Sequence, residues 1–185
     1  RMPESKRPRL IMAYFEQPDG HGHKYGPQDK RTGQVVEEMD SLVKTIWDEI
    51  QQLQIAADVN FIVTSDHGMT SISNERTIPV MKHLKKEWIE SVEGDLPGLI
   101  YVRKGFVDSV VFALHDVPHL KVWKREEVPA YLNYGSSPMI GDVVALPELG
   151  WLFTDKPVSS LGSHGFDPAY SDMHAMFRAV GPDFK

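Results

Sequence analysis

One strongly amphipathic helix between two short apolar runs constrains the fold of this chain more than any other feature. Apolar residues recur at steps of three and four over residues 35–53, which is the spacing of one broad apolar helix face. The runs at residues 9–15 and 59–64 are short, apolar and without helix caps, as expected of buried strands. Strand, helix and strand in this order predict a parallel unit of an α/β sheet that is covered on both faces.

The middle of the chain has a different pattern of predicted elements, which are shorter and are separated by loops. Residues 99–102, 120–123 and 142–146 predict strands and residues 107–115 a short helix, with a Pro/Gly/Ser-rich loop at 134–138. We therefore expect residues 82–149 to form a small α+β insertion. Residues 1–81 and 150–185 would form the main α/β body, with a final strand within residues 173–179.

Composition excludes several classes of protein. The chain has 185 residues, of which 41% are hydrophobic and 25% charged, which excludes a disordered chain or a coiled coil. No apolar run approaches the roughly 18 residues of a membrane span. The net charge of −6 argues against a nucleic-acid groove. The chain has no cysteine, which excludes a disulfide scaffold, a thiolate zinc site and a cysteine nucleophile.

Acidic and imidazole side chains follow both predicted strands. Asp19 and His23 lie in the loop after the first strand, and Asp66 and His67 end the second. His164 lies between two glycines near the end of the chain. Open α/β sheets place ligands at the carboxyl ends of their strands, and carboxylates with imidazoles suit zinc or a similar divalent ion.

Taken alone, each of these groups has a simpler interpretation as a turn former, a cap or a surface histidine. Together they predict a metal-dependent hydrolase whose class the spacing leaves open. We favour His23 over His21, because one short loop rarely directs two such close histidines to the same ion.

Three segments carry a resemblance to a known family. Residues 14–27 (YFEQPDGHGHKYGP), 64–69 (TSDHGM) and 162–167 (GSHGFD) resemble, in the same order, the metal motifs of nucleotide pyrophosphatase/phosphodiesterases. These enzymes belong to the alkaline phosphatase superfamily. The resemblance implies an alkaline-phosphatase-like α/β sheet flanked by helices, and a site with two zinc ions that cleaves phosphodiester or pyrophosphate bonds.

The resemblance also implies roles for five residues. Asp19, His23 and His164 would hold one zinc ion, and Asp66 and His67 would contribute to the other. Two such ions, about 3.5–4 Å apart, can stabilise both the attacking and the leaving oxygen of an in-line displacement.

The nucleophile that the family uses is not among the matching residues. In the family it is a threonine or serine that lies upstream of the first motif, together with one more aspartate ligand. Residues 1–9 contain neither threonine nor aspartate. We therefore expect no catalytic nucleophile in this chain, an incomplete domain with an open sheet edge, and no activity without an upstream segment. The family also implies an extracellular or periplasmic location and a small phosphodiester or nucleotide substrate.

Other interpretations remain open at this point. Phosphonate hydrolases, phosphomonoesterases and choline phosphodiesterases of the same superfamily share the metal loops. A non-catalytic fragment whose metal ions only stabilise the fold is a further alternative.

Overall fold

The predicted amphipathic helix is present as α2 (Lys30–Gln51) in the computed structural model, which describes residues 3–184. Its N-cap is Asp29, whose side chain accepts a hydrogen bond from the backbone N–H of Arg31 at 2.9 Å. Such a cap satisfies one of the amide groups that a helix start leaves unpaired. Thr32 is buried, and its hydroxyl donates to the carbonyl of Gly26 at 2.8 Å, which ties α2 to the preceding helix α1 (Asp19–Tyr25).

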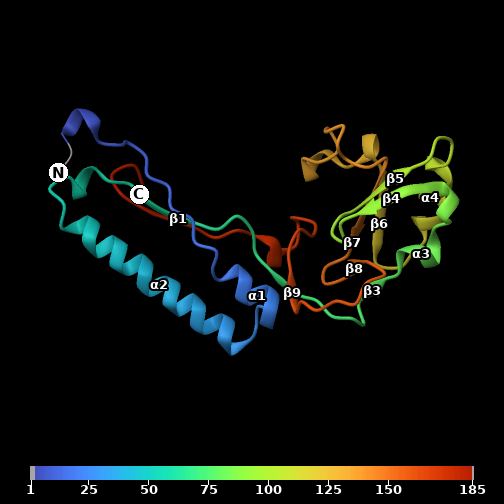
Figure 1. Ribbon diagram of the computed structural model, residues 1–185. Helices are drawn as coiled ribbons and strands as arrows, with labels where there is room; N and C mark the ends of the chain where they lie inside the picture. The colour runs from blue at the N-terminus through green and yellow to red at the C-terminus, as the bar shows by residue number, and fades with distance from the viewer. Residues whose placement is uncertain (1–2, 185) are drawn as a thin grey trace.

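A two-stranded antiparallel ribbon accompanies α2 at one end of the molecule (Figure 1). It consists of β1 (Phe61–Thr64) and β10 (Phe177–Val180), in a register that places Thr64 opposite Phe177. The ring of Trp47 in α2 lies 5.6 Å from that of Phe61, centroid to centroid. β1 lies within the predicted strand at residues 59–64, and β10 overlaps the predicted strand at 173–179 and extends one residue beyond it.

The prediction of a first strand at residues 9–15 is wrong. These residues form no strand, and their apolar side chains are exposed, with Met12 86% accessible. A strand exists only where a neighbouring backbone completes its ladder of hydrogen bonds, and no ladder in residues 3–184 includes this segment.

The parallel unit around α2 is therefore also absent from the described residues. β1 alternates between half-buried and exposed positions instead of being buried on both faces. Within residues 3–184, the parallel pair of strands is formed by β3 (Thr77–Ile78) and β8 (Leu152–Phe153). The apolar face of α2 is only partly covered by the rest of the described chain. Thr32 is the one residue of this helix that is buried.

A four-stranded antiparallel sheet lies at the other end of the molecule (Figure 1). Its order is β4-β5-β7-β6, and the expected strands and helix of this region are confirmed. The elements here are β4 (Ile89–Glu93), β5 (Gly98–Val102), β6 (Leu120–Lys124), β7 (Val143–Pro147), α3 (Val80–His83) and α4 (Val107–His115). In the register of β6 and β7, Trp123 lies opposite Val144.

The larger hydrophobic core belongs to this sheet and to α4. Its fully enclosed members, with 0% accessible surface, are Ile100, Val110, Leu114, Val143, Ala145 and Phe153. The sheet lies within residues 82–149, whose status as a separate insertion stays a prediction.

Between the two ends lie short elements that support the predicted metal motifs. β2 (Thr70–Ser71) pairs antiparallel with β9 (Gly162–Ser163), and α1 lies close by (Figure 1). A smaller core stabilises this region and contains Ile72, Leu152, Phe166 and Met173. The described chain also contains six short 3₁₀ helices: η1 (Glu4–Lys6), η2 (Ala56–Asp58), η3 (Lys86–Trp88), η4 (Arg125–Glu127), η5 (Ala130–Leu132) and η6 (Ser171–Met173).

The predicted α/β class is confirmed: residues 3–184 contain helices, antiparallel sheets and one parallel pair of strands. In residues 3–184, none of the helices combines the length and the apolar character that crossing a bilayer requires.

Candidate metal centre

Three of the predicted ligand residues converge on one point. Asp19 begins α1, His23 follows one turn later, and His164 comes from the loop after β9. The Nε2 atoms of the two histidines are 3.1 Å apart. Oδ1 of Asp19 lies 3.5 Å from Nε2 of His23 and 3.6 Å from Nε2 of His164. Together they form a triangle of one carboxylate and two imidazole atoms, which we call the triad.

The triad fits a divalent metal ion. Zinc binds imidazole nitrogen and carboxylate oxygen at about 2.0–2.2 Å in tetrahedral geometry, so two ligand atoms are about 3.3–3.5 Å apart. The three observed separations are close to this range. Oδ1 of Asp19 is also buried without a hydrogen-bond partner. A buried polar atom without a partner costs free energy, and a cation at this point would satisfy it.

The ring orientation of His23 is determined by the backbone on the opposite side. Its Nδ1 donates to the carbonyl of Gly162 at 2.9 Å, which leaves the Nε2 lone pair free to face Asp19 and His164. A hydrogen bond on the ring nitrogen that does not face the metal sets the tautomer and orientation of metal-binding histidines. A backbone hydrogen bond joins the same two segments, since the N–H of Leu161 donates to the carbonyl of His23 at 2.8 Å.

Close backbone packing brings α1 against β9. A Cβ atom on Gly22 would lie 2.3 Å from the sulfur of Met69, and one on Gly162 would lie 2.4 Å from the carbonyl oxygen of Gly22. Only glycine permits such an approach. The two glycines therefore set the distance between the helix that carries His23 and the loop that carries His164.

Asp66 and His67 lie beside the triad. The ring of His67 stacks on that of His164, with centroids 3.5 Å apart and an angle of 13° between the planes. Its Nδ1 donates to the carbonyl of Gly68 at 2.9 Å, and its Nε2 lies 3.5 Å from Oδ1 of Asp66. The Asp66 side chain is 75% exposed, and within residues 3–184 no third such ligand completes a group with these two.

The electrostatic environment favours the neutral form of the His164 imidazole by lowering its pKa. Burial lowers the pKa of its imidazole, and the neighbouring His67 lowers it further, while Asp19 opposes these effects only in part. A neutral imidazole is the form that binds metal ions.

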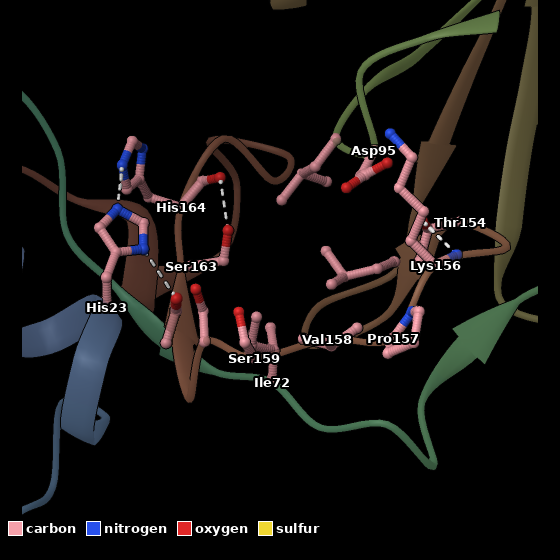
Figure 2. Close-up of a pocket in the computed structure, with 14 residues that line it drawn as sticks. His23, Ile72, Asp95, Thr154, Lys156, Pro157, Val158, Ser159, Ser163 and His164 are labelled. Carbon is pink, nitrogen blue, oxygen red and sulfur yellow. Dashed lines mark hydrogen bonds between the residues drawn. The ribbon is translucent and has the colours of Figure 1, made fainter.

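A pocket of about 380 Å³ adjoins the triad (Figure 2). His23 and His164 line one side of it. The opposite side is formed by Asp95 and by the loop that contains Thr154 and Lys156. The pocket therefore combines a cationic and an anionic side chain with the imidazoles, and it offers polar groups to a ligand held at the triad.

Sequence reasoning missed the residues on the far side of this pocket. Asp95 and Lys156 are separated by 61 positions and carry no motif, so no local pattern places them next to His164. His21 lies outside the triad, because its Nδ1 is hydrogen-bonded to the side chain of Gln17 at 2.9 Å.

Comparison with known proteins places this α/β fold among hydrolases of phosphate esters. Residues 1–167 match the family model described as type I phosphodiesterase / nucleotide pyrophosphatase. The chain belongs to this family, as its three motifs predict.

The relatives are ectonucleotide pyrophosphatase/phosphodiesterases. The chain is 34% identical to family member 5 from Homo sapiens over 185 residues, which cover 98% of this chain and 39% of that protein. It is 32% identical to bis(5'-adenosyl)-triphosphatase ENPP4 from Bos taurus over 186 residues, which cover 97% of this chain and 41% of the relative. The chain thus spans about two fifths of the length of these relatives.

Solved structures confirm the fold. Murine family member 5 superimposes with a TM-score of 0.84 at 34% identity, covering 93% of this chain and 47% of that one. A structure of an inactive variant of the same mouse protein in complex with AMP superimposes equally well.

Proposed function

We propose that this chain is part of a zinc-dependent phosphodiesterase that hydrolyses phosphodiester or pyrophosphate bonds in nucleotides. The observation that carries the proposal is the triad, in which a buried and unpaired carboxylate oxygen faces two imidazole nitrogens. Its occurrence in a chain of the type I phosphodiesterase family links this geometry to phosphate ester chemistry.

Each residue has a distinct part in this proposal. Asp19, His23 and His164 hold one zinc ion, and Asp66 and His67 contribute to a second. A bound divalent ion supplies positive charge that stabilises negative charge developing on the phosphoryl oxygens. The backbone carbonyl of Gly162 holds the imidazole of His23 in the tautomer that offers Nε2. The nucleophile is a threonine or serine outside this chain, so the chain alone is inactive.

The names of the relatives support a substrate class. Several are named as nucleotide pyrophosphatases or as bis(5'-adenosyl)-triphosphatases, and one has been solved with AMP. We infer a nucleotide diester as the substrate and a nucleoside monophosphate as a product. The prefix "ecto" in the names of these relatives supports an extracellular location.

Turnover of a nitrophenyl nucleotide diester by the intact protein tests the proposal. Asp19→Ala and His164→Ala should abolish zinc-stimulated turnover, because each removes a ligand atom from the triad. His115→Ala serves as the matched control, since this histidine is 74% exposed and pairs with Asp116 away from the site. Unchanged turnover in His164→Ala would refute the assignment. Faster turnover of a monoester or a choline phosphodiester would refute the nucleotide substrate alone.

A further inference from the structure

Asp167 is the most enclosed carboxylate of the described chain, with 3% accessible surface, and the metal chemistry leaves it unused. Its Oδ2 accepts hydrogen bonds from the hydroxyl of Tyr131 at 2.7 Å and from Nζ of Lys121 at 3.1 Å. Its Oδ1 accepts from the backbone N–H of Ala169 at 3.0 Å. Asp167 therefore accepts three hydrogen bonds, which join its own loop to β6 and η5.

The loop that contains Asp167 also presents His164. At its beginning, β9 pairs with β2, and the carbonyl of Gly162 holds His23. Gly165, between His164 and Asp167, has a φ of +96°, where a side chain would be strained. Phe166 is buried in the small core. The contacts of Asp167 hold the other end of the six-residue segment 162–167, which consists of β9 and the start of this loop.

The two side chains that bind Asp167 come from a distant part of the chain. Lys121 belongs to β6 of the four-stranded sheet, and Tyr131 belongs to η5. Both residues are partly exposed: the Lys121 side chain is 45% accessible, and Tyr131 as a whole residue is 53% accessible. Burial of apolar surface therefore does not explain why these two side chains lie at Asp167. The contacts join the sheet to the loop that presents His164.

We propose that Tyr131 and Lys121, acting through Asp167, are positioning residues for His164 and set the metal affinity of the triad. This inference rests on the proposed function, because it assumes that the triad binds a metal ion. Groups that hydrogen-bond directly to a metal ligand commonly change metal affinity by about 10–100-fold when they are removed. Tyr131 and Lys121 act one step further away, through Asp167 and the loop, so the lower end of this range is expected. The triad is sensitive to such changes, since its atoms are only 3.1–3.6 Å apart.

The chain contains a matched pair of tyrosines for the test. Tyr131 donates to Asp167 at 2.7 Å, and Tyr101 donates to the carbonyl of Met139 at 2.7 Å within the region of the sheet. Tyr131→Phe and Tyr101→Phe therefore each remove one hydroxyl and one hydrogen bond of the same length. Lys121→Met provides an independent change at Asp167, should Tyr131→Phe fail to fold.

The experiment measures Zn²⁺ affinity of the intact protein by competition with a chromogenic chelator, together with the visible spectrum of the Co²⁺-loaded protein. We expect Tyr131→Phe and Lys121→Met to weaken Zn²⁺ binding by about 10-fold and to alter the Co²⁺ spectrum. Tyr101→Phe should match the wild type in both.

Three results would overturn the inference. Wild-type affinity in Tyr131→Phe and Lys121→Met would show that Asp167 does not position His164. Equal weakening in Tyr101→Phe would show a general loss of stability. If the wild type and His164→Ala bind Zn²⁺ equally, the triad is not a metal site, and the proposed function fails with the inference.

Discussion

Replacing Gly162 with alanine should push α1 away from β9 and weaken the triad. The added Cβ would lie 2.4 Å from the carbonyl oxygen of Gly22 and 2.9 Å from the sulfur of Met69. Ordinary van der Waals contact begins at 3.4 Å, so the backbone contact is about 1 Å too short. The obstructing atom belongs to the helix backbone, and a side-chain rotation cannot relieve the clash.

The size of the effect follows from this displacement. Overpacking of a closely packed contact typically costs about 1–3 kcal/mol, which for a chain of this length lowers the melting temperature by roughly 2–12 °C. A shift of α1 by about 1 Å also carries His23 and Asp19 away from His164. Because Nε2 of His23 and Nε2 of His164 are 3.1 Å apart, such a shift would widen this separation to about 4 Å, beyond the roughly 3.3–3.5 Å between ligand atoms of tetrahedral zinc, and should weaken binding.

Thermal unfolding and Zn²⁺ titration of the intact protein measure both consequences. Gly33→Ala is the control, since this glycine lies in α2 and a Cβ there meets nothing within 4 Å. Alanine at an open helical position should stabilise by about 0.4–1 kcal/mol. If Gly162→Ala retains the melting temperature and the Zn²⁺ affinity of the wild type, then close backbone approach does not set the geometry of the triad.

Three further predictions concern stability. Burial alone would raise the pKa of Asp167, but the hydrogen bonds from Ala169, Tyr131 and Lys121 outweigh burial and lower the pKa. The ionised carboxylate therefore stabilises the fold at pH values above its unfolded pKa of about 4. This contribution is lost as the pH falls through the folded pKa. The difference in unfolding free energy between wild type and Asp167→Asn should thus shrink in acid denaturation, and a constant difference would contradict this. Asp29→Ala should fray the start of α2, which hydrogen exchange would show as lost amide protection near its first turn; retained protection would argue against capping. Ile100→Ala should cost about 2–5 kcal/mol in denaturant unfolding, because its side chain is fully enclosed, whereas a cost below 1 kcal/mol would mean that the core refills the cavity.

Local patterns in the sequence predicted much of the secondary structure of this protein. The 3.6-residue spacing of apolar side chains over residues 35–53 predicted α2, which begins five residues earlier and ends two residues earlier than this pattern, since a helix completes its backbone hydrogen bonds within one segment. Short apolar runs predicted the strands β5, β6 and β7 and the helix α4, whereas β4 was not predicted. Residue types and spacing indicated only a metal site of open class, and the resemblance of the motifs to nucleotide pyrophosphatase/phosphodiesterases implied that Asp19, His23 and His164 act together.

Contacts between distant segments were decided only by the tertiary structure. The apolar run at residues 9–15 resembles a strand, but strand formation depends on a neighbouring backbone, and the described chain provides none. β1 pairs with β10 rather than with that run. Likewise, no local pattern could reveal that Tyr131 and Lys121 hold Asp167, because hydrogen bonds between segments that lie 36 and 46 residues apart depend on how the sheet and the loop pack together.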